Sequence, residues 1–398
     1  MSKLLLTTTS YPPAIGGAQL HTHQILKRLS PDFPVQVVTQ WAENRTDWLF
    51  GTTLNAPAAP KAYTFEGVPV QLITLTRRER RQVLPYALAY YALKPTAIDQ
   101  IAARLLLKIE PLARDCQLIH NTRIGREPLS FASLKTARKL GIPFVFTPYH
   151  HPRWVGWNYR DYLNLYRRAD ALIALTQAEK ETLIALGVSA GRIFITGIGP
   201  IVADQADPAT FRQQHHIPPE APLVLFLGQK YRYKGYEALA AAAKIVWAKL
   251  PDTYFLFIGP QTPASKKFFA RQQDRRLIEL GQVDLPQKTD ALAACTLLCL
   301  PSTQESFGGV YTEAWSFGKP VIGANIPAVA EVIDDGVNGY LVSPTAQDIA
   351  EKIGYLLDQP AAAYQLGQAG RQKVVEKYSW DKLAQKTEEI YTTVVTGG

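Results

Sequence analysis

Two carboxylates eight positions apart mark the segment of this sequence best suited to chemistry. Glu305 and Glu313 follow an apolar run at residues 297–301 that is typical of a buried strand. Ser306, Gly308 and Gly309 leave backbone N–H groups free at the predicted start of a helix, which is where a pyrophosphate is held best. An ordinary helix with an acidic first turn is the alternative. That alternative predicts one early carboxylate, without two glycines and a second glutamate.

Helical geometry sets the separation of these two acids. If most of the residues between them are helical, at ~1.5 Å each, the carboxylates lie on the order of 10 Å apart. Two acids at this separation can flank a diphosphate. One would then hold sugar hydroxyls and the other ribose hydroxyls.

A basic turn follows the predicted strand at residues 223–227. It runs from Gly228 to Gly235 and contains Lys230, Arg232 and Lys234. A lysine that stands next to a glycine before a helix can reach a phosphate whose negative charge grows as a bond to it breaks. Lys234 has that position. Taken alone, the turn also fits a solvated basic surface.

Two features of the first half also stand at predicted strand ends. Gly16 and Gly17 lie between a strand at residues 3–9 and a helix that begins near Ala18, and glycines there let the backbone approach a ligand. The strand at residues 143–148 leads to His150 and His151. Adjacent side chains on extended backbone point to opposite sides, so we expect one imidazole to enter a site. A common Gly-Gly turn and two surface histidines are the alternatives.

Alternating strand and helix patterns must position these residues. Short apolar runs separated by helical patterns predict parallel βα units, at residues 3–9, 35–39, 68–75, 117–120, 143–148 and 171–176. The rhythm restarts after a polar stretch at residues 202–222, with runs at 223–227, 254–258, 297–301, 320–322 and 339–342. We therefore predict two α/β domains, residues 1–200 and 201–379, with a ligand in a cleft at their strand ends. An amphipathic helix at residues 380–395 is expected to pack back on the first domain.

The segment around Glu305 and Glu313 resembles the Glu-x7-Glu signature of glycosyltransferase family 4. The resemblance continues through residues 318–322, 328–333 and 335–339, in the order and spacing of that family's donor domain. It implies a GT-B fold, two Rossmann-like domains that face each other across a cleft. It also implies transfer of a hexose-type sugar, with retained configuration, from a nucleotide diphosphate sugar to an acceptor hydroxyl. The second domain would bind the donor.

The family pattern carries over residue by residue. It implies that Lys234 and Glu305 are catalytic, together with a histidine that contacts the transferred sugar, for which we favour His151 over His150. The chain has Gln229 where the family usually has arginine, and Lys230 or Arg232 would replace that cation. Expected donor-binding residues are Gly16, Gly17, Gln229, Lys230, Arg232, Lys234, Glu305, Ser306, Phe307, Gly308, Gly309, Val310 and Glu313.

The sequence predicts no metal site. His21 and His23 are two positions apart on a helical pattern, so their side chains diverge. No Asp-x-Asp is present, and Asp334 and Asp335 belong to a turn. Glycosyltransferases that use Mg²⁺ or Mn²⁺ need such carboxylates. Basic residues and helix N–H groups would act on the diphosphate instead, and we expect no cofactor besides the nucleotide sugar co-substrate.

Charge is distributed unevenly along the chain. Residues 1–200 contain 24 Lys and Arg against 13 Asp and Glu, whereas residues 201–398 contain 19 against 21. The asymmetry favours an anionic partner of the first half, either a membrane surface or an anionic acceptor. No motif supports nucleic acid binding. The three cysteines are too few for a disulfide framework and are expected to be buried, in a cytoplasmic protein without a secretion signal or membrane span.

Residues 77–93 combine cations with aromatic and aliphatic side chains. They begin Arg77-Arg78-Glu79-Arg80-Arg81 and continue into an apolar run. This composition suits a peripheral contact with the inner face of a membrane, where each cation near an anionic leaflet contributes ~1 kcal/mol. It also supports the expectation of a lipid-linked acceptor, which many family 4 enzymes use. A solvated turn that leads into a core helix is the alternative.

Three other functions are compatible with the same fold. A GT-B epimerase or a phosphorylase also binds phosphates between two such domains, and a membrane-associated scaffold could keep the fold without transfer. Gln229 is the one feature that favours the scaffold. Fold alone does not separate these functions, because function belongs to the site. The sequence specifies neither the base and sugar of the donor nor the acceptor or the oligomeric state.

Overall fold

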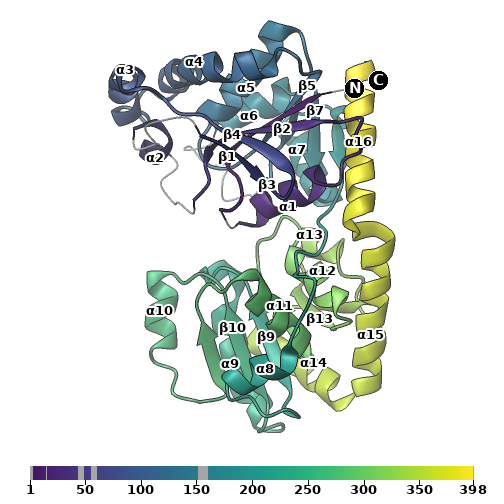
Figure 1. Cartoon of the computed structure of the whole chain (residues 1–398). Coiled ribbons are helices and arrows are strands. Elements are labelled where there is room, and N and C mark those ends of the chain that lie inside the picture. The colour runs from purple at the N-terminus through teal and green to yellow at the C-terminus, as the bar shows by residue number, and fades with distance from the viewer. Residues whose placement is uncertain (1–2, 15, 44–48, 55–60, 151–159, 398) are drawn as a thin grey trace. The chain divides into compact units, whose positions relative to one another are not determined.

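The computed structural model describes residues 3–14, 16–43, 49–54, 61–150 and 160–397 (Figure 1). The chain forms two compact units, Met1–Gly197 with Trp380–Gly398, and Ile198–Ser379. The chain therefore passes from the first unit to the second close to residue 200, where the polar stretch indicated a boundary. The C-terminal segment returns to the first unit.

An eight-stranded sheet forms the centre of the first unit. Its order is β3-β4-β2-β1-β5-β6-β7-β8, and all neighbours are parallel except the β3–β4 hairpin. The central strands are covered on both faces, so in β1 all seven residues are buried, the three leucines as well as the threonines and the serine. The strands are β1 (Leu4–Ser10), β2 (Val35–Trp41), β3 (Lys61–Phe65), β4 (Val68–Leu72), β5 (Leu118–Thr122), β6 (Phe144–Thr147), β7 (Ala171–Ala174) and β8 (Ile193–Ile195).

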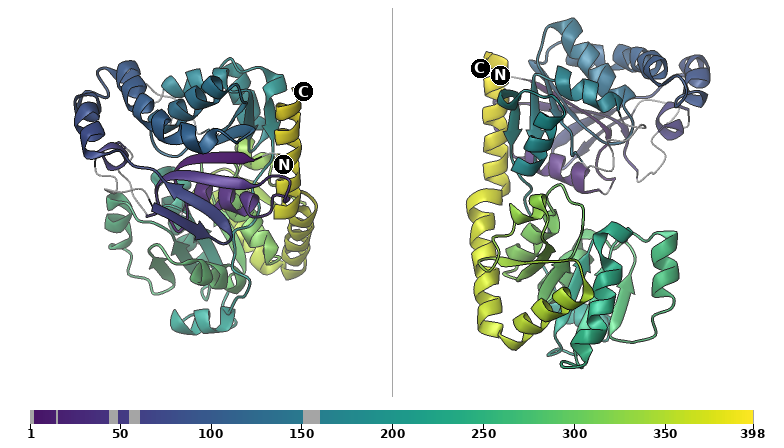
Figure 2. Two further views of the ribbon diagram at one scale, coloured as in Figure 1. Left: turned by 45° about the horizontal axis from the view of Figure 1, so that its top comes forward. Right: turned by 180° about the vertical axis from the view of Figure 1, so that it is seen from behind.

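Helices cover both faces of this sheet (Figure 2). Leu5 points into a core built with α3 to α7, whereas its neighbours Leu4 and Leu6 point into a second core with α1 and α16. This alternation is the strand period of two. The helices are α1 (Gly17–Leu26), α2 (Phe50–Thr53), α3 (Arg77–Leu88), α4 (Lys94–Ala113), α5 (Pro128–Leu140), α6 (Asp161–Arg168), α7 (Gln177–Ala185) and α16 (Trp380–Thr396).

The second unit contains a six-stranded parallel sheet of order β11-β10-β9-β12-β13-β14. This is the Rossmann order, in which the direction of winding reverses between the first and fourth strands, here β9 and β12. Ligands of such sheets bind at that reversal, beyond the carboxyl ends of the strands. The strands are β9 (Leu223–Leu227), β10 (Tyr254–Ile258), β11 (Leu277–Leu280), β12 (Leu297–Leu300), β13 (Val321–Ala324) and β14 (Gly339–Val342).

Most helices of the second unit follow a strand of its sheet, whereas α8 precedes the first strand. Side-chain caps start several of them, for example Asp284 at α11 and Thr345 at α14, each of which accepts the backbone N–H three residues on. The helices are α8 (Pro208–Gln214), α9 (Tyr236–Trp247), α10 (Pro263–Phe269), α11 (Leu285–Ala294), α12 (Gly309–Ser316), α13 (Pro327–Ala330), α14 (Ala346–Asp358) and α15 (Pro360–Lys373).

Three strands were not predicted from the sequence: β3, β8 and β11. All three lie at sheet edges. The residues of β3 are mostly exposed, those of β11 are only half-buried, and β8 has three residues. Edge strands are exposed on one side and need no continuous apolar run, so their signal in the sequence is weak.

Candidate active site in the second unit

Lys234 and Glu305 meet at the reversal point of the second sheet. Lys234 ends a short 3₁₀ turn after β9, and Glu305 lies in the loop after β12. Lys234 Nζ donates to Glu305 Oε1 at 2.6 Å, and both side chains are largely buried. The sheet thus brings together two residues that are 71 positions apart in the sequence, and both were predicted.

Backbone contacts hold these two loops together. Thr303 N donates to Tyr233 O at 2.8 Å, and Ser302 Oγ donates to the same carbonyl at 3.3 Å. Gly235 has a φ of +81°, and a Cβ at this position would lie 2.5 Å from the carbonyl oxygen of Pro301. Only glycine fits this close approach. The ion pair therefore rests on a fixed backbone.

Helix α12 begins with two glycines beside the ion pair. Gly308 is the N-cap residue, with a φ of +84° and without a side-chain cap. A Cβ on Gly308 would lie 2.4 Å from the ring of Tyr311, and that ring is anchored because its hydroxyl donates to Leu300 O at 3.0 Å. The first N–H groups of a helix attract anions. The start of α12 thus has the free backbone typical of anion-binding helix starts, and a pyrophosphate there stays a prediction.

The residues around this helix start differ in exposure. Phe307 is buried, and its ring packs edge-on against Tyr378 at 5.2 Å. Its role in this structure is therefore packing. Ser306 and Val310 are half-buried, and Gly309 lies close to Ile198, which a Cβ would approach to 3.2 Å.

Glu313 lies inside α12 and pairs with a second lysine. Its Oε1 accepts from Lys288 Nζ at 2.8 Å, and only 6% of the residue is exposed. Burial raises the pKa of Glu313, while Lys288 and the backbone of Ile201 oppose that shift. Lys288 was not predicted, because it lies in α11 without any motif around it. The two acids thus pair with different lysines.

The basic turn does not supply all the expected cations. Lys230 is fully buried, and its Nζ bonds to Glu279 and to the carbonyl oxygens of Gly259 and Leu280. Burial lowers the pKa of Lys230. This differs from the expected phosphate contact, because its ammonium already joins the ends of β10 and β11. Gln229 is exposed, and Arg232, whose side chain is 87% exposed, pairs with Glu237 at 3.1 Å.

The glycine turn of the first unit lies after β1, beside the reversal point of its sheet. Gly16 is the N-cap of α1, and the helix begins at Gly17, one residue before the expected start. A Cβ on Gly16 would lie 2.2 Å from Oε1 of Gln19, whereas a Cβ on Gly17 would meet open space. The Cβ on Gly16 would meet only the end of the flexible Gln19 side chain, so the structure requires glycine at neither position.

His150 is buried at the end of β6, and His151 lies outside the described residues. The backbone N–H of His150 donates to Glu179 Oε1 at 2.6 Å, and its ring lies edge-on to Tyr166. Arg123, at the end of β5, donates to Tyr166 Oη at 2.9 Å. Burial raises the pKa of Glu179 to about 7. Sequence reasoning missed Glu179, Tyr166 and Arg123; for Arg123, its place at a strand end was the available signal.

His21 and His23 diverge, as predicted. His21 faces Tyr149 Oη at 2.8 Å and Gly197 O at 3.2 Å, whereas His23 faces Tyr11 and Glu66. Over the described ranges, no three His, Cys, Asp or Glu side chains are grouped to hold a metal ion. All three cysteines are buried and unpaired.

Sequence comparison assigns a family to each unit. Residues 16–199 match the glycosyl transferase 4-like domain, and residues 207–373 match the glycosyl transferases group 1. The chain belongs to the family 4 type of glycosyltransferases. The resemblance drawn from the Glu-x7-Glu segment and its continuation is therefore confirmed at the level of the family.

Curated relatives of this glycosyltransferase are distant. It is 26% identical over 248 residues to the alpha-maltose-1-phosphate synthase of Mycobacterium tuberculosis, covering 57% of the chain and 64% of that protein. It is 27% identical over 341 residues to the sulfoquinovosyl transferase SQD2 of Arabidopsis thaliana, covering 80% of the chain and 63% of that protein. The chain thus spans less than two thirds of the length of either relative.

The fold of this glycosyltransferase matches solved structures over its whole length. Anabaena Alr3699/HepE, solved in complex with UDP and glucose, has a TM-score of 0.74 at 20% identity, covering 99% of this chain and all of that chain. The predicted GT-B fold, with two α/β units on parallel sheets, is confirmed. In the part of the chain that the structure describes, no helix is both long and apolar enough to span a bilayer.

Proposed function

We propose that this glycosyltransferase transfers a hexose-type sugar, with retention and without a metal ion, from a nucleotide diphosphate sugar to an acceptor hydroxyl. One observation carries the proposal: Lys234 and Glu305 form an ion pair at the reversal point of the second sheet, beside the uncapped start of α12. A cation and free N–H groups suit a diphosphate, and an adjacent carboxylate suits sugar hydroxyls.

The roles follow from the charges that the donor would bring. The start of α12 binds the pyrophosphate, and Lys234 stabilises the negative charge that grows on the leaving phosphate. Glu305 accepts hydrogen bonds from the sugar, and Glu313 accepts them from the ribose. Arg232 is the exposed cation that would compensate for Gln229. Attack from the face that the nucleotide leaves, and a histidine beside the sugar, for which we favour His151, are what the family implies.

A panel of sugar nucleotides tests this proposal. UDP-, GDP- and ADP-sugars are screened by thermal shift, since a ligand at 100 times its Kd stabilises the protein by ~2.7 kcal/mol. Each stabilising donor is then assayed for hydrolysis and for transfer. Conversion of the sugar nucleotide into a different sugar nucleotide without an acceptor would indicate an epimerase. A requirement for free phosphate would indicate a phosphorylase. A protein that binds a sugar nucleotide but never cleaves it would be a scaffold.

Helix α3 supports a peripheral contact with an anionic membrane. Arg77, Arg81, Leu84 and Leu88 are all exposed and fall on one stripe of the helix, because they follow helical spacing. Leu88 is 68% exposed, and Tyr91 and Leu93 continue the apolar surface beyond it. Cations followed by exposed apolar side chains suit the boundary between headgroups and acyl chains. A lipid-linked acceptor would be presented at such a surface.

Vesicle sedimentation tests the membrane contact. We expect binding to vesicles that contain phosphatidylglycerol and little binding to pure phosphatidylcholine. Leu88→Ser should weaken binding ~10-fold, since burying a leucine contributes ~1.5 kcal/mol or more. The matched control is Leu107→Ser, which changes an equally apolar residue that is 53% exposed on α4. Equal losses in both variants would contradict a contact through α3.

A further inference from the structure

The loop that leads into α1 is held from the side by a hairpin. Tyr11 is the first residue after β1 and is fully buried, and its backbone N–H donates to Trp41 O at 3.1 Å. The next residue, Pro12, accepts at its carbonyl oxygen from Tyr63 Oη of β3 at 2.8 Å. The hairpin of β3 and β4 therefore already contacts the loop that carries Gly16.

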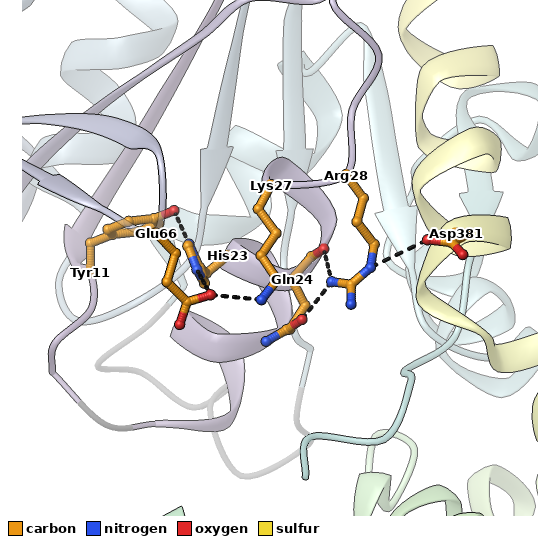
Figure 3. Close-up of polar contacts among 7 residues, drawn as sticks. All are labelled: Tyr11, His23, Gln24, Lys27, Arg28, Glu66 and Asp381. Carbon is orange, nitrogen blue, oxygen red and sulfur yellow. Dashed lines mark hydrogen bonds and ion pairs between the residues drawn. The ribbon is translucent and has the colours of Figure 1, made fainter. Parts of the chain in front are cut away.

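A second connection runs from the same hairpin through a histidine (Figure 3). Tyr11 Oη and His23 Nδ1 are 2.7 Å apart, and His23 Nε2 is 3.2 Å from Glu66 Oε2. Lys27 Nζ donates to the same glutamate oxygen at 2.6 Å. Glu66 stands in the turn between β3 and β4, while His23 and Lys27 lie on and just after α1. Three separate parts of the chain thus meet at one imidazole.

The charges at this cluster define the tautomer of His23. The Lys27 ammonium lowers the pKa of Glu66, so its carboxylate is ionised and can only accept hydrogen bonds. Burial lowers the pKa of His23, against the opposing effect of Glu66, so the imidazole is neutral. Lys27 and Arg28 also act against a charged ring. His23 therefore carries its proton on Nε2, and its Nδ1 accepts from the Tyr11 hydroxyl.

The backbone at Glu66 is also unusual. Glu66 has a φ of +44° and Gly67 a φ of +83°, so both central residues of this turn are left-handed. Hairpin turns of that kind favour asparagine, aspartate or glycine at the first position, because a larger side chain is disfavoured there. A residue retained in a disfavoured conformation points to a role for its side chain. Here that side chain bonds to His23 and Lys27.

We propose that Glu66 and His23 are positioning residues, which fix Tyr11 and Pro12 at the start of the loop that carries Gly16 and Gly17, for the ligand that binds there. Glu66 sets the tautomer of His23, and His23 in turn holds Tyr11 at the start of the loop. This inference rests on the proposed function, together with the donor-binding role that the family resemblance implies for Gly16 and Gly17. Neither residue touches the substrate, so their effect is on binding geometry.

Steady-state kinetics of matched variants test the positioning role. Glu66→Ala should raise the KM for donor or acceptor about 10-fold while kcat changes less than about 2-fold, because a misplaced loop weakens binding. Glu66→Gln keeps an acceptor for Nε2–H and should restore the wild-type KM. The control is Arg28→Met, which removes the 3.3 Å pair between the segment after α1 and Asp381 of α16. An unchanged KM in Glu66→Ala, or an equal rise in Arg28→Met, would overturn the proposal.

Nitrogen NMR of the His23 ring tests the same proposal without any activity. We expect the Nε2–H tautomer in the wild type and a mixture of tautomers in Glu66→Ala. An Nδ1–H ring in the wild type would overturn the inference even if the enzyme transfers sugar as proposed. If the protein shows the expected tautomers but turns over no sugar nucleotide, the arrangement of Glu66 and His23 stands and the proposed function is contradicted.

Discussion

Lys234 and Lys288 each pair with one acid of the Glu-x7-Glu pair. We expect substitutions in the two pairs to have different consequences. Lys234 stands where charge would grow on the leaving phosphate. Lys234→Ala should therefore lower kcat ~100-fold or more, since loss of one preorganised stabilising group costs ~3 to 4 kcal/mol of barrier. Single-turnover assays measure this effect. Lys244→Ala, which removes an exposed lysine from α9, is the control. A wild-type rate in Lys234→Ala would exclude Lys234 from the mechanism.

Glu313 should act on binding more than on chemistry. Glu313→Gln keeps the side-chain volume beside Lys288 but removes the charge that would accept from a ribose. Hydrogen bonds to charged groups contribute ~1.5 to 3 kcal/mol, so the Kd of the donor nucleotide should rise ~10-fold or more. Calorimetric titration with the nucleotide diphosphate measures the change. The ribose role would be wrong if kcat fell and this Kd stayed the same.

At the level of single residues, sequence reasoning found the groups that belong to motifs and missed a partner that lies outside them. Lys234 and Glu305 were predicted, and their 2.6 Å contact follows from the order of the strands. Lys288 was missed, because it has no neighbouring motif and reaches Glu313 only through the packing of two helices. Lys230 shows the opposite problem. Its position in the basic turn indicated a phosphate contact, but the adjacent strand ends bind its ammonium.

At the level of elements, the start of α12 depends on Gly308. Alanine at this position would have a disfavoured positive φ and a Cβ 2.4 Å from the buried Tyr311 ring. We expect Gly308→Ala to lower the free energy of unfolding by ~2 kcal/mol or more and to weaken donor binding. Urea unfolding measures the stability. The control is Gly354→Ala inside α14, where a Cβ meets nothing within 4 Å. That variant should be ~0.5 kcal/mol more stable than the wild type. An equal loss of stability in both variants would show that the turn at Gly308 does not require glycine.

The strands differ in how clearly their amino-acid composition predicts them. Central strands such as β9 and β10 are uninterrupted apolar runs, so composition alone locates them. Of the β3–β4 hairpin, only β4 was predicted. The residues of β3 are mostly exposed, and the turn contains Glu66 in place of a typical turn residue. The cluster around His23 was therefore not predictable. It needs the hairpin and α1 to be placed side by side.

At the level of the whole molecule, the C-terminal helix belongs to the first unit although it follows the second along the chain. Its amphipathic pattern indicated this packing, but its polar anchors were not predictable. Tyr391 of α16 bonds through its hydroxyl to His120 Nδ1 at 2.7 Å, and Trp380 packs against His21 at 5.6 Å between ring centroids. Both histidines lie on the other elements of this contact, β5 and α1. Two buried imidazoles thus secure the return of the chain.

Acid should weaken this anchoring of α16. Burial lowers the pKa of His120 to about 3 and that of His21 to about 4, both from 6.5. Each neutral imidazole therefore contributes stability that is fully present above pH 6.5 and is lost as the pH falls from 6.5 toward the folded-state pKa. For His120 the loss between pH 7 and pH 5 is ~2 kcal/mol.

The variant His120→Gln tests this loss, because its side chain does not titrate. Between pH 7 and pH 5, the free energy of unfolding in urea should fall by ~2 kcal/mol less in the variant than in the wild type. Glu179, whose pKa burial raises to about 7, titrates in both proteins and cancels in the comparison. Parallel pH curves for the two proteins would show that His120 does not secure the helix by its neutral form.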